Sequence, residues 1–99
     1  MEAHPGVVFR DGPMGRRPGL VDGPDIWEVM RLFLAVRDQD GDPAERVADL
    51  AGLTAAMVRT AVRYYADHAD EVDAWIERAN AVAAEAEDAW HREQALLRR

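Results

Sequence analysis

Cysteine is absent from the 99-residue chain, which excludes disulfides, thiol chemistry and the usual cysteine-based zinc finger. Lysine is absent too, so all twelve basic residues are arginine. No apolar run approaches the length that spans a bilayer, and the N-terminus lacks the apolar segment of a signal peptide. These absences favour a cytoplasmic protein. The length fits one small domain, and 48% hydrophobic with 31% charged residues is typical of a folded one.

Familiar catalytic patterns are missing as well. The chain has no Walker-type phosphate loop and no defensible Ser-His-Asp order. Only one of the three histidines, His91, has acids at helical spacing (Glu87 and Asp88), and a metal site needs more ligands on one face. The sequence therefore predicts a protein that is not an enzyme and that uses no cofactor and no metal.

Negative charge dominates, with a formal net charge of −7. This argues against strong non-specific binding to nucleic acid. The acids are unevenly placed, because residues 67–99 hold nine of them against four arginines. This acidic third suggests a second, basic partner, and an ordinary solvated helix face is the alternative.

The segment from Asp42 to His68 has the spacing of a helix-turn-helix. Asp42 is placed to cap a first helix that begins at Pro43, with Glu45 positioned for a capping box. Gly52 suits the left-handed conformation that ends this helix, and Thr54 is placed to cap the second. The predicted buried positions are Val47, Ala48, Leu50 and Ala51 in the first helix, and Met57, Val58, Ala61, Val62 and Tyr65 in the second.

The second helix of such a motif can lie in the DNA major groove. Arg59 and Arg63 are one turn apart, so both can reach the same groove. The candidate base-reading residues are Arg59, Thr60 and Arg63, with Thr54 and Ala55 near the DNA backbone. The alternative is that the two helices only build a small core.

A β-hairpin and one helix are predicted before this motif. Val7 to Phe9 and Arg16 to Val21 suit two strands around a turn at residues 11–15, and Arg16 and Arg17 are candidate phosphate contacts. Such a hairpin is marginal alone, so it must pack on the helices or pair with a second copy. A helix from about Asp25 to Asp38 follows, with Asp25 and Glu28 as a capping pair.

From about Asp67 to Leu97 the chain has no Gly or Pro and is rich in Ala, which predicts one long helix. A helix of this length spans roughly 45 Å, whereas a 100-residue domain has a radius of gyration of about 13 Å. Its end should therefore pass its own core and need an apolar surface from a second subunit or another protein. The alternative is a helix that bends back or frays after about Ala86. The candidate partner-binding residues are Trp75, Ala79, Val82, Ala86, Trp90, Leu96 and Leu97.

From about Pro5 to Glu77 the chain resembles a bacterial family, the domain of unknown function four-three-three, a set of small VapB-like antitoxins. The resemblance rests on the hairpin phrase HPGVVFRDGPMGRRPGLVDGPDIWEV, on the helix-turn-helix, and above all on YYADHADEVDAWI at Tyr64–Ile76. The family's usual Gly-Thr-Arg hairpin phrase is here only Val21-Asp22-Gly23-Pro24. The resemblance implies a trihelical or winged DNA-binding fold that neutralises a toxin with a PIN-like ribonuclease fold and represses their shared operon.

The sequence thus predicts a mainly α protein: a trihelical helix-turn-helix core with an N-terminal β-hairpin and a long C-terminal helix. Residues 1–6 form a flexible tail, residues 7–66 the domain, and residues 67–99 the helix for dimer or partner contact. The function expected is that of a homodimeric antitoxin-type regulator. The alternatives are a stand-alone dimeric transcription regulator and a protein-interaction module without DNA binding.

Overall fold

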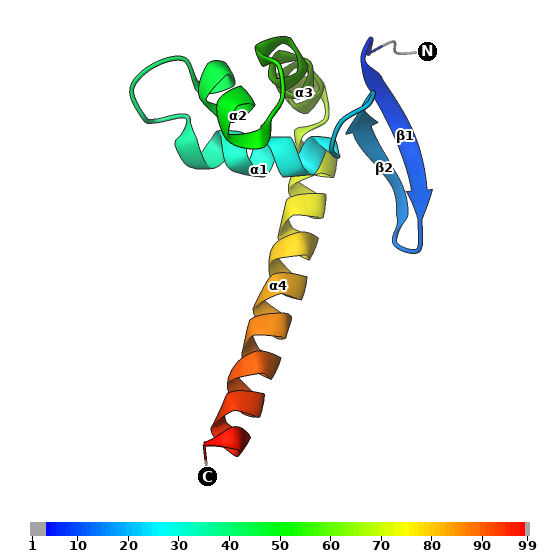
Figure 1. The fold of residues 1–99 in the computed structure, drawn as a ribbon. Helices are drawn as coiled ribbons and strands as arrows, with labels where there is room; N and C mark the ends of the chain where they lie inside the picture. The colour runs from blue at the N-terminus through cyan, green and yellow to red at the C-terminus, as the bar shows by residue number, and fades with distance from the viewer. Residues whose placement is uncertain (1–3, 99) are drawn as a thin grey trace.

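The computed structural model describes residues 4–98 (Figure 1). The elements follow the order β1 (Val7–Gly12), β2 (Gly15–Leu20), α1 (Ile26–Val36), α2 (Pro43–Ala51), α3 (Ala55–Asp67) and α4 (Ala69–Leu97). The predicted fold class is confirmed, since a helical core carries an N-terminal antiparallel hairpin and a long C-terminal helix. Part of the predicted tail, residues 1–3, lies outside the described residues. Along the part of the chain that is described, no helix is both long and apolar enough to cross a membrane.

Local signals set the ends of α2 and α3 as the sequence predicts. The Asp42 carboxylate accepts a hydrogen bond from the Ala44 amide at 2.9 Å, and Pro43 occupies the first turn of α2. Gly52 ends α2 in the left-handed conformation at φ 71°, where a β-carbon would meet no atom within 4 Å. The Thr54 hydroxyl accepts a hydrogen bond from the Met57 amide at 3.1 Å. The turn between the two helices is therefore fixed at both of its ends.

The core lies between α1, α2, α3 and the first turns of α4. Its largest fully buried side chains come from all of these elements and from β2: Leu20, Ile26, Met30, Val47, Val58 and Val72. Ala48, at 7% exposure, is small enough for α2 and α3 to approach closely. Because Val72 is fully buried, the core extends into the segment after residue 66.

Three predicted burial positions are wrong. Leu50 and Ala51 face solvent, because α2 packs on its neighbours only through the face that carries Val47 and Ala48. Tyr64, not Tyr65, is the buried tyrosine, at 2% exposure. The N-terminal segment and α4 cover Tyr64, with the His4 and His68 rings against its ring and its hydroxyl donating a hydrogen bond to Glu71. Tyr65 is half-buried instead, and its hydroxyl donates a 2.8 Å hydrogen bond to Asp73.

The hairpin is attached to α1 by a buried carboxylate. Asp25 accepts a hydrogen bond from Arg10 on β1 at 2.9 Å and one from Arg17 on β2 at 2.6 Å. The second Arg10 nitrogen donates to the Leu20 and Gly23 carbonyls. The predicted capping role of the Asp25 side chain is therefore wrong: Asp25 occupies the N-cap position, but both arginines take its carboxylate and it makes no side-chain cap.

The helix α4 points away from the rest of the molecule, as predicted (Figure 1). It begins after a break at His68 and continues for 29 residues to Leu97. Its first turns pack on α1 and α3, and every residue from Ala81 to Glu93 is exposed. The radius of gyration is 16.2 Å, against about 13 Å for a compact domain of this size. The alternative of a helix that bends back over the domain is therefore wrong.

Candidate nucleic-acid interface

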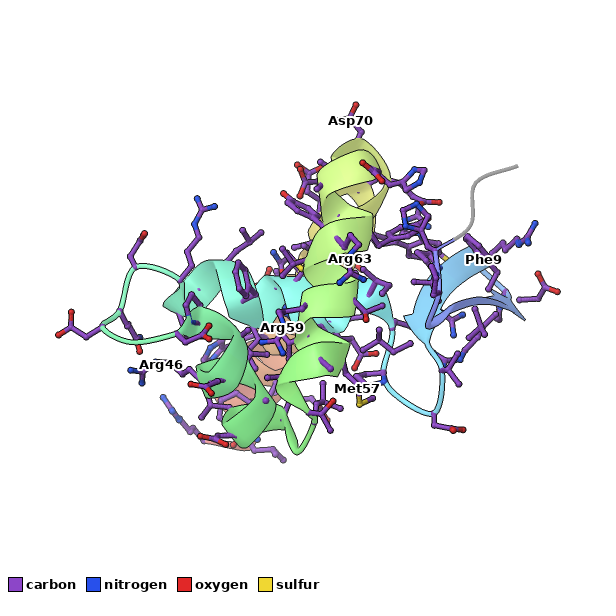
Figure 2. The ribbon with its side chains drawn as sticks, turned by 90° about the horizontal axis from the view of Figure 1, so that it is seen from above. Phe9, Arg46, Met57, Arg59, Arg63 and Asp70 are labelled. Atoms are coloured by element: carbon purple, nitrogen blue, oxygen red, sulfur yellow. The ribbon has the colours of Figure 1, made fainter. Side chains whose placement is uncertain are left out.

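The face of α3 that carries Arg59 and Arg63 lies opposite the long helix. Viewed from above, with α4 running away behind the domain, both arginines lie along the front of α3 (Figure 2). Both are exposed, and among residues 4–98 no ion pair is recorded for either guanidinium. The two predicted base-reading arginines therefore share one open surface.

An apolar hollow of about 380 Å³ lies beside these two arginines. Phe33 and Val62 supply apolar surface from α1 and α3, and the first residues of α2 complete the lining. An arginine can bind guanine through two hydrogen bonds, and apolar side chains contact the thymine methyl group. This surface thus combines the two types of side chain that such base contacts use.

The other predicted contacts on α3 divide into two groups. Thr54 is exposed at the N-terminus of α3, and Ala55 beside it is half-buried. Thr60 is turned toward the N-terminal segment, where a β-carbon on Gly6 would lie 3.1 Å from its methyl group. The Thr60 hydroxyl also donates to the Ala56 carbonyl at 3.0 Å. The prediction that Thr60 shares the outer face with Arg59 is therefore wrong, because the N-terminal segment partly covers it.

The hairpin beside α3 offers one free arginine rather than two. Arg16 is exposed and stacks over the Phe9 ring, with 4.5 Å between the guanidinium carbon and the ring centroid. Arg17 is 27% exposed and its Nε donates to the buried Asp25, so its predicted phosphate contact stays a prediction that competes with this ion pair. Phe9, which the sequence did not single out, is 46% exposed and lies at the hairpin side of this surface (Figure 2).

The distribution of charge weakens the objection that an acidic chain avoids DNA. The exposed half of α4, residues 81–97, holds four acids and one arginine, so the remainder of the chain carries a net charge of −4 rather than −7. The exposed half of α4 extends away from α3 (Figure 1). Its charges lie farther from α3 than the screening length of about 8 Å at physiological salt. They therefore oppose DNA binding only weakly.

The predicted partner-binding residues differ in exposure along α4. Trp75 and Ala79 are half-buried, because the hairpin turn and Trp27 lie beside them. Exposure rises toward the end of the helix, with Val82 at 60%, Trp90 at 54%, Leu96 at 69% and Leu97 at 74%. Ala86 is exposed as well. Exposed apolar side chains that gather on one part of a surface are typical of interaction sites.

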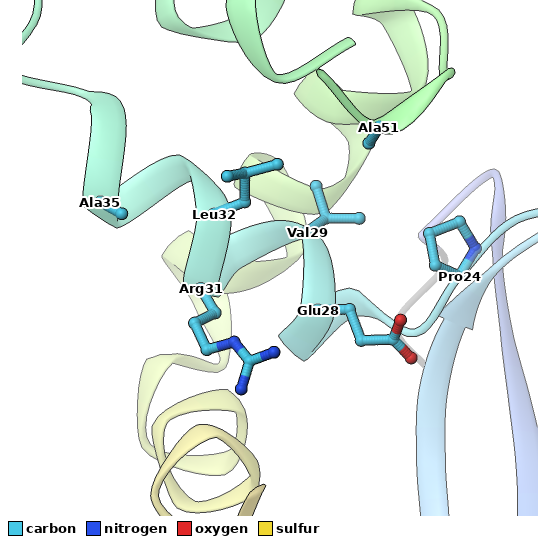
Figure 3. Close-up of a pocket in the computed structure, with 7 residues that line it drawn as sticks. All are labelled: Pro24, Glu28, Val29, Arg31, Leu32, Ala35 and Ala51. Carbon is cyan, nitrogen blue, oxygen red and sulfur yellow. The ribbon is translucent and has the colours of Figure 1, made fainter. Parts of the chain in front are cut away.

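A second apolar hollow, of about 500 Å³, lies on the other side of α1 from the α3–α4 contact (Figure 3). Five of its seven lining residues are apolar, and Glu28 and Arg31 are the charged ones. The seven residues that line this hollow can contact an apolar molecule, and none of them is a nucleophile with an adjacent base.

His4 pairs with Asp67 at 3.6 Å. His91 pairs with Glu87 at 3.5 Å, and within residues 4–98 no group of three or more potential ligands is placed to hold a metal ion.

Comparisons with protein-family models, characterised proteins and solved structures found no match to this chain.

Proposed function

We propose that this chain is an antitoxin-type regulator that binds DNA through α3 and a protein partner through α4. The observation that carries the DNA part is the exposed pair Arg59 and Arg63 on the second helix of a helix-turn-helix. On an α3 seated in the major groove, the two guanidiniums reach successive base edges. Thr54 and Arg16 lie at the two flanks of this face, where they can contact phosphates.

The partner part rests on the exposed end of α4. An amphipathic helix binds a partner by laying its apolar face into a groove, with anchors spaced three and four residues apart. The acids around this face suit a basic partner. A ribonuclease must attract RNA phosphates, so its active site is expected to be basic, and an acidic helix can compete with RNA there. In the resemblance drawn from the sequence, that partner is a PIN-like ribonuclease in the cytoplasm, and the DNA is the shared operator.

Binding to duplex DNA from upstream of the gene tests the first part. Fluorescence anisotropy should show affinity that falls with salt, as it does for proteins that neutralise phosphates. Each arginine-to-base contact carries about 1–3 kcal/mol of discrimination, so Arg59→Ala with Arg63→Ala should abolish the preference over scrambled DNA. Arg98→Ala, at the far end of α4, removes an exposed arginine away from the interface and should bind normally. Unchanged binding by the double variant would refute the assignment.

Removing residues 86–99 tests the second part. Residues 86–93 and 95–98 are all exposed, so circular dichroism should show a folded domain with less helix. A tagged full-length chain should retain a nuclease-like protein at near-equal amount, and the truncated chain should lose it. Retention of the same partner by the truncated chain would contradict the assignment of α4.

A protein-interaction module without DNA binding is the second candidate, because the net charge of −7 favours it. It differs in the anisotropy measurement: such a module shows no salt-dependent DNA binding. A stand-alone regulator binds DNA but has no nuclease gene next to its own.

A further inference from the structure

The base of α4 carries an apolar groove that the sequence did not predict. The groove holds about 380 Å³ and lies between the hairpin turn, the start of α1 and the first turns of α4. We call it the base groove. Its apolar lining comes from Pro13, Met14, Trp27, Trp75, Ala79 and Val82. Arg78 lies at its edge, stacked on the Trp75 ring at 4.3 Å.

The other end of α4 presents exposed apolar side chains on the same side of the helix. Trp90, Leu96 and Leu97 form this tip. From Trp75, steps of four and three residues lead through Ala79, Val82, Ala86 and Ala89 to Glu93 and Leu96. Side chains at such steps lie along one face of a helix. Trp90 and Leu97 border this face, because each follows one of these positions by one residue. From Trp75 to Leu97 this face is about 33 Å long. One chain therefore carries a groove and a matching apolar tip on the same face.

We propose that the occupant of the base groove is the tip of a second copy, with the two α4 helices packed antiparallel. A two-fold symmetric interface uses the same surface on both subunits, so tip meets groove twice. A parallel pair would place tip against tip and leave both grooves open. This inference deepens the proposal that α4 is an interaction surface and does not depend on DNA binding.

Side-chain size supports the antiparallel arrangement. In an antiparallel pair the numbers of two facing residues have a constant sum. When this sum is about 175, large residues of one copy meet small ones of the other. Leu96 lies opposite Ala79, and Trp90 lies beside Ala83. A helix pair packs closely when large and small side chains alternate across the seam in this way.

Charge supports the same register. Glu85 and Arg92 border the apolar face on one side, seven residues apart. In the antiparallel register Glu85 of each copy meets Arg92 of the other. Glu93 interrupts the apolar face; in this register it lies opposite Val82 of the second copy, about one helical turn from Arg78 of that copy. A parallel, in-register pair would instead bring the two Glu93 side chains together, and like charges at such positions are unfavourable.

The exposed area is also what a second copy would cover. The chain exposes 6830 Å², whereas a compact monomer of 11.1 kDa is expected to expose about 5,700 Å². The excess of about 1,100 Å² exceeds the roughly 800 Å² that each partner buries in a stable interface. A self-paired dimer therefore accounts for the surplus surface.

Antiparallel pairing has two consequences for the proposed function. The two α3 faces would lie at opposite ends of the dimer, so they cannot occupy neighbouring half-sites about 34 Å apart on one duplex. A partner that binds the tip must also separate the two copies. Self-association and partner binding are then mutually exclusive.

The absence of cysteine makes a direct test simple. Glu77→Cys and Arg98→Cys place spin labels at exposed positions 21 residues apart. In the antiparallel dimer each label should lie about 32 Å along the axis from its own symmetry mate, and a mixed 77–98 pair should be close. A parallel dimer reverses this pattern and overturns the proposal. Light scattering that finds only monomer at roughly 200 micromolar protein also overturns it.

Charge reversal supplies a second test. Glu85→Arg or Arg92→Glu alone should weaken self-association at least about fivefold, because two exposed ion pairs are lost together. The double variant restores both pairs and should associate like the original chain. Failure of the double variant to recover would contradict the register. Arg59→Ala with Arg63→Ala should dimerise normally, so loss of DNA binding and loss of pairing remain separate results.

Discussion

Replacing Asp25 with alanine is expected to release the hairpin from the helical core. Asp25 is 7% exposed and accepts hydrogen bonds from Arg10 at 2.9 Å and Arg17 at 2.6 Å. A hydrogen bond to a charged group contributes about 1.5–3 kcal/mol, which gives about 3–6 kcal/mol for the two. The arginine side chains are 33% and 27% exposed, and Arg10 keeps two carbonyl partners. Water can therefore resolvate part of the freed charge, which lowers the expected loss to about 2–4 kcal/mol.

Urea unfolding followed by circular dichroism measures this loss directly. In thermal unfolding, the same loss of about 2–4 kcal/mol should lower the melting temperature of a domain this size by about 10–20 °C. Asp49→Ala on the exposed side of α2 is the matched control and should change stability little. Because Arg17 and Asp25 also line the base groove, Asp25→Ala should weaken self-association. A stability loss below about 1 kcal/mol would refute the role given to this carboxylate.

Three further outcomes follow from single contacts. Gly52→Ala should cost about 1–2 kcal/mol in urea unfolding, because the left-handed backbone is strained while the space for a methyl group is open. Gly19→Ala should destabilise more than Gly52→Ala, because its β-carbon would collide with the Arg10 guanidinium and push it from Asp25; an equal loss would contradict this. The hydrogen bond to Asp73 raises the pKa of Tyr65 above its ordinary value of 10.0, because the folded state favours the neutral phenol. That contribution is full below the unfolded pKa of Tyr65 and is lost as pH rises through its raised, folded-state pKa. In urea unfolding, Tyr65→Phe should therefore destabilise the protein at neutral pH and cost less at strongly alkaline pH.

The sequence predicted best what neighbouring residues decide. The ends of α2 and α3 depend on Asp42, Pro43, Gly52 and Thr54, and each acts on atoms within four residues. The length of α4 follows equally locally from a run without glycine or proline. The structure confirms all of these because no distant group competes for them.

The errors came where a distant residue takes over a side chain. Asp25 has the right spacing for a capping box, but Arg10 and Arg17 from the hairpin bind its carboxylate. The same carboxylate also engages Arg17, one of the candidate phosphate contacts. The sequence places Thr60 on the outer face because helical spacing alone cannot show that the N-terminal segment folds over it. The base groove was missed for the same reason, since it joins three elements distant in sequence.

Selection of bound fragments from the genomic DNA of the source organism tests the central claim most directly. If α3 reads DNA, the protein should enrich a defined sequence that includes the region upstream of its own gene. Arg59→Ala with Arg63→Ala, analysed alongside, should enrich none. Enrichment of no sequence by the original chain, or of the same sequence by the double variant, would contradict the assignment of α3 as the DNA-reading helix.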